Sequence, residues 1–187
     1  MIGEGEPFPA AYKARQFQEL PAAADAAELR PDGRSSPGGL IFEVDPEGID
    51  SWIGVARPSS VRAPDAVTGL FSAPAPGTLC AIAQGAAYLV NVRTRNYCVV
   101  SRSAPVMAVA SLPGVNLLLL ATPWLVTAIG HDGVAWRTRR LAIDGLRLDE
   151  TDGSRLAGVA DPDSAEPREF TIDLLTGSHQ GGAMVTS

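Results

Sequence analysis

The chain has 187 residues and a formal net charge of −6, from 15 basic and 21 acidic side chains. Hydrophobic residues make up 45% and charged residues 19%, a balance typical of a globular protein that buries a core without a metal or disulfide. Nucleic-acid binding is not expected, because proteins of that class concentrate positive charge to displace the counterions of phosphate.

Nothing in the sequence indicates secretion or membrane insertion. Residues 1–7 contain neither the basic nor the apolar region of a secretory signal. The most apolar window, residues 115–130, is interrupted by polar residues and a proline, and it falls short of the roughly 20 apolar residues of a membrane-spanning helix. We therefore predict a cytoplasmic location and no membrane partner.

The N-terminal part, residues 1–38, is predicted to be an arm or linker, because it is rich in alanine, proline, glycine and charge. Only Ala10–Leu20 suggests a short helix or an arm laid on the body, and Pro21 would end it. The ordered core is expected to begin near Leu40. A single domain then spans residues 39–182, and residues 183–187 form a tail.

From Leu40 onward, short apolar or alternating runs are separated by turn residues, a pattern that indicates many antiparallel strands. The predicted strands are Leu40–Val44, Ser51–Ala56, Val67–Ser72, Thr78–Ala83, Ala87–Val92, Tyr97–Ser101, Val106–Ser111, Asn116–Ala121, Leu125–Ile129, Val134–Thr138, Leu141–Ile143, Leu146–Asp149, Arg155–Ala160 and Glu169–Leu174. Asp132-Gly133 and Asp152-Gly153 are hairpin signals, because Asp-Gly accepts positive φ in a tight turn. The predicted fold is therefore all-β, built from antiparallel meander units.

A weak internal repeat narrows the choice of architecture. Residues 52–58 and 156–162 share a pattern ending in Gly-Val-Ala-x-Pro, and residues 108–111 lie about midway between them. A period near 50 residues is in the range of propeller blades. A full propeller needs more blades than this chain can supply. We therefore expect a partial propeller, an assembly completed by oligomerisation, or a β-sandwich.

The residues that usually build metal, redox or cofactor sites are sparse. Cys80 and Cys98 each lie in an apolar run, which favours buried reduced thiols, although a disulfide between neighbouring strands stays open. His131 and His179 show no ligand spacing with other residues. Nucleotide-binding fingerprints are also missing. We predict no cofactor and no metal.

Two groups of residues are candidates for binding. Carboxylates cluster at residues 144–152 and 161–166, although aspartates gather in turns to cap backbone amides and are expected there chiefly as turn residues. Trp136 alternates with Arg137, Arg139 and Arg140 and could present an aromatic and cationic face to an anion, but a core tryptophan is the favoured interpretation.

The C-terminal half resembles a known family. Residues 132–146, DGVAWRTRRLAIDGL, are followed by Phe170–Gly177, FTIDLLTG, and by Gly181-Gly182. This order is similar to that of a family of uncharacterised bacterial proteins with relatives in plants, whose pattern contains G-x-x-W-x-[ST]-x-R-L and F-x-V-D-L-x-T-G-x-x-x-G-G. The resemblance covers roughly residues 76–182 and implies no activity. This chain has Ala142 where the family often has tryptophan.

Read physically, the shared motif maintains the fold. Trp136 and Leu141 are expected to pack inward, and Asp144-Gly145 to form a turn. Asp173 with Thr176-Gly177 is expected to close a turn by capping backbone amides.

Two functions of different class follow. The first is a non-enzymatic binding or interaction module, whose partner is a protein or a second copy of the chain joined through sheet edges. The second is a small hydrolase or isomerase that acts on an anionic molecule through Asp144 or Asp173, with Arg139 fixing the anion. The candidate ligand-binding residues are Trp136, Arg139, Asp144 and Asp173.

Overall fold

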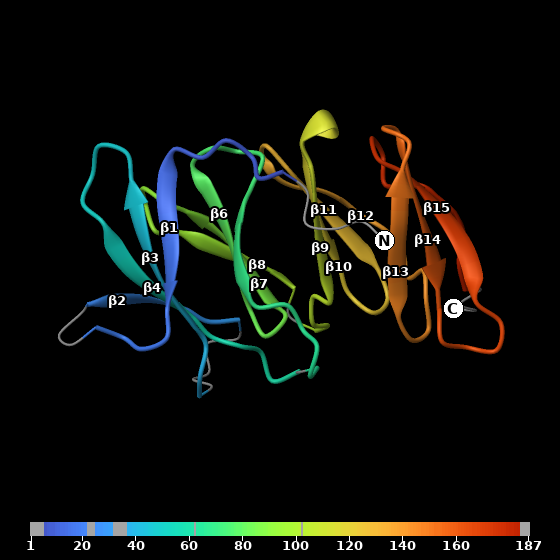
Figure 1. The fold of residues 1–187 in the computed structure, drawn as a ribbon, viewed down its shortest axis with the longest axis horizontal. Coiled ribbons are helices and arrows are strands. Elements are labelled where there is room, and N and C mark those ends of the chain that lie inside the picture. The colour runs from blue at the N-terminus through green and yellow to red at the C-terminus, as the bar shows by residue number, and fades with distance from the viewer. Residues whose placement is uncertain (1–5, 22–24, 32–36, 62, 102, 184–187) are drawn as a thin grey trace. The chain divides into compact units, whose positions relative to one another are not determined.

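The computed structural model describes residues 6–21, 25–31, 37–61, 63–101 and 103–183. Over these residues it contains sixteen strands in four four-stranded sheets, one 3-10 turn at Pro113–Val115 and no α-helix (Figure 1). The prediction of an all-β fold of antiparallel meander units is confirmed. Within the same residues, no helix has the length and apolarity required to span a membrane.

Residues 7–106 form one compact unit, and Glu6 with residues 107–183 forms another. The first unit holds two sheets. In the first sheet the order is β1 (Tyr12–Phe17), β3 (Leu40–Pro46), β4 (Trp52–Ala56), β2 (Ala26–Leu29). In the second sheet β5 (Gly69–Ser72), β6 (Thr78–Ala83), β7 (Ala86–Asn91) and β8 (Tyr97–Ser101) follow one another as a meander.

The core of this first unit lies between its two sheets. Strand β3 alternates buried and partly exposed residues, so Phe42 and Val44 point to the same side. They join Trp52 from β4 and Tyr88 from β7 in one apolar cluster. The Trp52 indole N–H donates to the carbonyl oxygen of Val92 at 2.9 Å, which satisfies the one polar group of that ring.

The N-terminal residues correct the sequence interpretation. The segment predicted as a helix or arm at Ala10–Leu20 is strand β1, which pairs antiparallel with β3. Strand β2 pairs parallel with β4 and buries Leu29, which is 1% exposed. The core therefore begins well before Leu40, since this segment supplies both outer strands of the first sheet.

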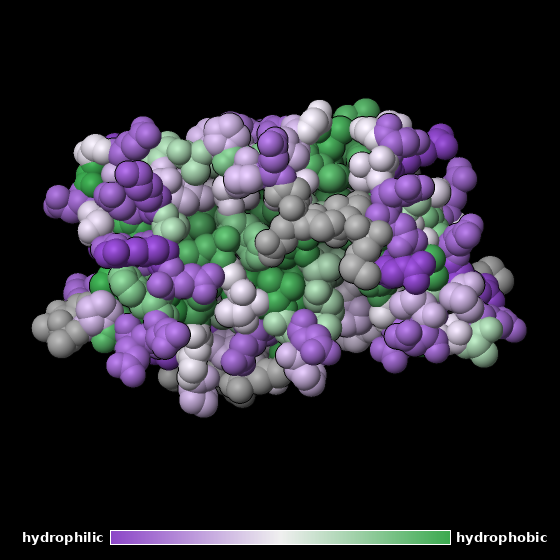
Figure 2. Space-filling view, in the orientation of Figure 1, coloured by the Kyte–Doolittle hydropathy of each residue, from purple (hydrophilic) through white to green (hydrophobic). Residues whose placement is uncertain are grey.

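The second unit contains two sheets, and both are meanders. One consists of β9 (Ala108–Leu112), β10 (Leu117–Ala121), β11 (Val126–Gly130) and β12 (Gly133–Arg137), and the other of β13 (Leu146–Thr151), β14 (Arg155–Ala160), β15 (Arg168–Asp173) and β16 (His179–Gly181). Their shared core includes Leu119, Leu156, Phe170 and Ile172. Figure 2 shows mainly hydrophilic residues over β13–β15, at the right of that view.

The repeated Gly-Val-Ala sequence lies on two inner strands, where its glycine leaves room for an aromatic ring of the neighbouring strand. Gly54 in β4 lies opposite Phe42 in β3, and a Cβ at Gly54 would lie 2.4 Å from the Phe42 ring. Gly158 in β14 lies opposite Phe170 in β15, again with 2.4 Å between the Cβ position and the ring. The period near 50 residues is wrong, because the second, third and fourth sheets begin at Gly69, Ala108 and Leu146, in steps of 39 and 38 residues.

Two further predictions are corrected. Leu141–Ile143 is a loop, because the Leu141 N–H donates to Trp124 and the Arg140 side chain donates to the carbonyls of Ala142 and Ile143. Cys80 and Cys98 are both free thiols, which was the favoured interpretation, and only the expected burial of Cys98 is wrong. Cys98 is exposed, and Leu89 of β7 separates the two in the ladder. Burial raises the pKa of the Cys80 thiol to about 12, which keeps it protonated.

Candidate functional site

The β15–β16 turn holds one of the predicted site residues, Asp173. Its Oδ1 accepts hydrogen bonds from the Leu175 and Thr176 amides at 3.1 and 2.8 Å and from the Thr176 hydroxyl at 2.8 Å. These donors stabilise the ionised carboxylate and lower its pKa, the Thr176 hydroxyl most of all. The predicted amide cap is therefore confirmed.

Trp136 packs against the same turn. Its ring is 9% exposed, and its indole N–H donates to the carbonyl oxygen of Leu174 at 2.8 Å. Gly177 has φ +72°, and a Cβ there would lie 2.7 Å from the ring. Trp136 and Leu141 are both buried, as the motif predicted, and both belong to the hydrophobic core of this unit.

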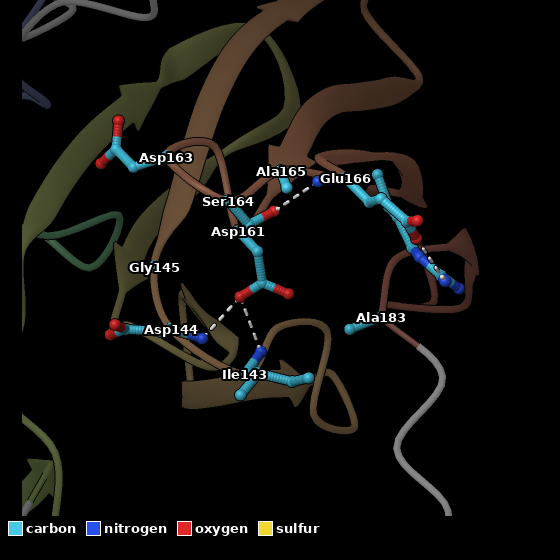
Figure 3. A pocket seen from close by; sticks show the side chains of 10 residues that line it. Ile143, Asp144, Gly145, Asp161, Asp163, Ser164, Ala165, Glu166 and Ala183 are labelled. Carbon is cyan, nitrogen blue, oxygen red and sulfur yellow. Dashed lines mark hydrogen bonds and ion pairs between the residues drawn. The ribbon is translucent and has the colours of Figure 1, made fainter.

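A different region, at the open end of the β13–β14 hairpin, contains the largest of the cavities described here, about 740 Å³. The last ladder pair of this hairpin is Leu146 with Ala160, and beyond it the Asp161 N–H donates to the carbonyl oxygen of Gly145 at 2.9 Å. This pairing brings residues 143–145 beside residues 161–168, which are distant in sequence. The cavity is lined by Ile143, Asp144, Gly145, Asp161, Asp163, Ser164, Ala165, Glu166, Arg168 and Ala183 (Figure 3).

Asp161 is the central polar group of this cavity. It is 9% exposed, and its Oδ1 accepts hydrogen bonds from two successive amides, those of Ile143 at 2.9 Å and Asp144 at 2.5 Å. Its φ of +52° is in the left-handed region, which aspartate tolerates better than most residues. Within the described part of the chain no donor reaches Oδ2, which points toward the side of the cavity where Ala183 lies (Figure 3).

The remaining lining combines negative charge with apolar surface. Among the described lining residues, Asp144, Asp163 and Glu166 add three carboxylates and Arg168 adds one guanidinium. Arg168 lies 3.8 Å from Glu166, so part of its charge is balanced within the cavity wall. Ile143 is 62% exposed, an unusual position for so apolar a side chain. The cavity therefore offers carboxylates beside an exposed aliphatic group.

The four candidate residues from the sequence are not brought into one site. Asp144 lines the cavity just described, whereas Asp173 lines a smaller one of about 260 Å³ with Arg155, Thr176 and His179. Arg139 is exposed and lines neither, and Trp136 is in the core. Neither of these two cavities therefore combines Arg139 with the carboxylate of Asp144 or Asp173, as the enzyme hypothesis would require.

Asp161 was recognised in the sequence only as one of several acidic turn residues. Its role depends on the register of β13 with β14, which places it against the amides of residues 143 and 144. The available signal was its position directly after a buried strand and before Pro162. Among the described residues, no group of three histidine, cysteine or carboxylate side chains is arranged to hold a metal ion.

Over its described residues the chain is thus an all-β protein of four-stranded sheets, three of which are meanders, and propellers and sandwiches are assembled from sheets of this kind. No family model matches it, and no curated protein is similar to it. Among solved structures it is similar to dihydro-heme d1 dehydrogenase NirN in complex with DHE, with 14% identity and a TM-score of 0.46, over 98% of this chain and 37% of that one. It is also similar to the N-terminal domain of Nup159, with 12% identity and a TM-score of 0.38, over 97% of this chain and 52% of that one.

Proposed function

We propose that the protein is a non-enzymatic interaction module that binds a partner protein at the cavity formed by residues 143–145, 161–168 and 183. The observation that carries the proposal is Asp161, a largely buried carboxylate with one oxygen fixed by two amides and the other open to the cavity. Such a group is oriented before any partner arrives, which reduces the entropy lost on binding.

The surroundings of Asp161 support binding in preference to chemistry. A hydrolase or isomerase needs an acid, a base or a nucleophile converging on one reacting atom. Here Asp161 already serves as a backbone cap, and Asp144 and Asp173 line separate cavities. The exposed Ile143 at the rim adds apolar area of the kind that a partner covers.

Sheet edges are a weaker candidate for the partner surface. Strand β13 at the edge of its sheet carries a bulge between Leu148 and Glu150 and an ion pair between Arg147 and Asp149 at 2.7 Å. Bulges and charged side chains on an edge strand oppose pairing with another chain. We therefore place the partner at the cavity rather than along this edge.

Site-specific photo-crosslinking tests this function without assuming the chemistry of the partner. A photoreactive phenylalanine derivative replaces Ala165, which is exposed and lines the cavity, in the full chain expressed in its own cells. The same residue at Ala14, exposed on β1 in the other unit, is the matched control. We expect a discrete crosslinked species from position 165 that position 14 does not give. Equal crosslinking from both positions, or none from 165, would overturn the proposal.

A further inference from the structure

We infer that the group this cavity receives is the guanidinium or ammonium of a basic protein segment. The inference rests on the proposed function, because it names the chemistry of the partner that the same cavity binds. The observation that supports it is the state of the Asp161 carboxylate. Asp161 is 9% exposed, and its Oδ2 faces the cavity and accepts no hydrogen bond from any described residue (Figure 3).

The Oδ2 of Asp161 can accept a hydrogen bond from a ligand, and a positively charged donor would form the strongest one. A carboxylate can accept only, so the complementary group must carry N–H or O–H. Hydrogen bonds from a cation to a carboxylate are roughly twice as strong as neutral ones. The two amides on Oδ1 hold the carboxylate in place while leaving Oδ2 free for that bond.

The charge around Asp161 favours a cation over an anion. Asp144, Asp163 and Glu166 share the lining with Asp161, and the nearby positive charges include Arg168, 3.8 Å from Glu166, and Arg140, which donates to the Ile143 carbonyl oxygen at 3.1 Å. Among the described lining residues the four acidic side chains outnumber the one arginine, so an entering phosphate or substrate carboxylate would be repelled. The net charge of −6 on the whole chain adds attraction for a basic partner at longer range.

The apolar part of the lining fits the stem of lysine or arginine. Ile143, Ala165 and Ala183 border the cavity, and Ile143 is 62% exposed. Long basic side chains cover apolar surface with their methylene groups while their charged ends reach a polar partner. A bare metal ion has no such stem, and the described residues hold no cluster of three ligands for one. Both features select an organic cation.

Binding of short labelled peptides to the full chain tests the inference. The probes are fluorescein-labelled hexa-arginine, hexa-lysine and hexa-glutamate, followed by fluorescence anisotropy. Asp161→Asn keeps an oxygen for the two amides but removes the charge. Asp132→Asn is the matched control, because the Asp132 side chain is 99% exposed and lies outside the cavity. Thermal unfolding of each variant shows whether it is folded, and Glu166→Gln and Ile143→Ser replace Asp161→Asn if that variant is not.

We expect hexa-arginine or hexa-lysine to bind, hexa-glutamate not to bind, and Asp161→Asn to weaken binding about tenfold or more while Asp132→Asn changes it less than about twofold. Equal weakening by both variants would show general charge attraction and overturn the inference. If position 165 still crosslinks a partner in cells while the basic peptides do not bind, the proposal of an interaction module is retained and the inference of a basic partner is rejected. If both experiments are negative, both proposals fail.

Discussion

At the scale of single residues, two glycines are required because an aromatic ring occupies the place of their side chain. A Cβ at Gly158 would lie 2.4 Å from both the Phe170 ring and the Arg147 carbonyl oxygen. Phe170 is 2% exposed and cannot move into solvent without opening the core. The same geometry at Gly54 against Phe42 explains why the sequence contains two similar strings on inner strands.

Gly158→Ala is therefore expected to destabilise the protein by about 1–3 kcal/mol, the usual cost of overpacking a core. Gly77→Ala is the matched control, because nothing lies within 4 Å of a Cβ there. Urea unfolding followed by tryptophan fluorescence measures both variants. Equal stability of the two variants would show that the Phe170 ring does not occupy that space.

Asp173 gives a prediction for pH. The Thr176 hydroxyl and two amides hold the pKa of this carboxyl below its ordinary value, near 3.9 in unfolded chains. The ionised form is thus favoured by the fold, so the stabilisation is present above the unfolded pKa and is lost as pH falls through the folded pKa. Carbon NMR of the Asp173 carboxyl should titrate below pH 4, and Asp173→Asn should reduce the loss of stability in that range. A titration at or above the ordinary value would contradict this account.

At the scale of elements, the N-terminal strands differ most from the sequence expectation. Strand β1 buries little of its own surface, with four of its six residues exposed, so no apolar alternation marks it as a strand. It forms because its backbone pairs with β3, and Tyr12 donates its hydroxyl to the Thr78 carbonyl at 3.0 Å. Strand β2 has four residues and one buried leucine, Leu29.

Leu29→Ala is expected to cost about 2–5 kcal/mol, because it would open a cavity under β2. Leu20→Ala is the matched control in the same N-terminal segment, since Leu20 is 45% exposed, and it should change stability by less than about 0.5 kcal/mol. Thermal and urea unfolding compare the two. Equally mild effects of both substitutions would show that Leu29 is not part of the core and would favour the surface arm that the sequence suggested for residues 1–38.

The sequence predicted strand bounds correctly where the residues of a single strand form a clear apolar run. Thr78–Ala83, Tyr97–Ser101 and Arg155–Ala160 were predicted with the bounds observed, because apolar runs there end at turn residues. Candidate-site residues were harder to identify, since Asp161 meets the amides of residues 143 and 144 only through the pairing of β13 with β14. Strand register depends on packing across a sheet, which no local pattern records.

At the scale of the whole molecule, the chain is two compact units, each with a core between two four-stranded sheets, and the candidate cavity belongs to the unit that contains residues 107–183. The net charge of −6 on the whole chain attracts a basic partner at longer range than the carboxylates of the cavity alone. Raising salt from about 0.05 M to about 0.5 M should therefore weaken binding by screening, while the contact at Asp161 persists in part.

The most direct test of the central claim is a two-dimensional amide NMR titration of the isotope-labelled full chain with hexa-arginine. The account predicts that the amides of residues 143–145, 161 and 163–166 shift together with one affinity, and that residues 173–180 around the smaller cavity do not. Shifts centred on the smaller cavity, shifts spread evenly over acidic side chains, or none at all would contradict a basic-segment site at Asp161.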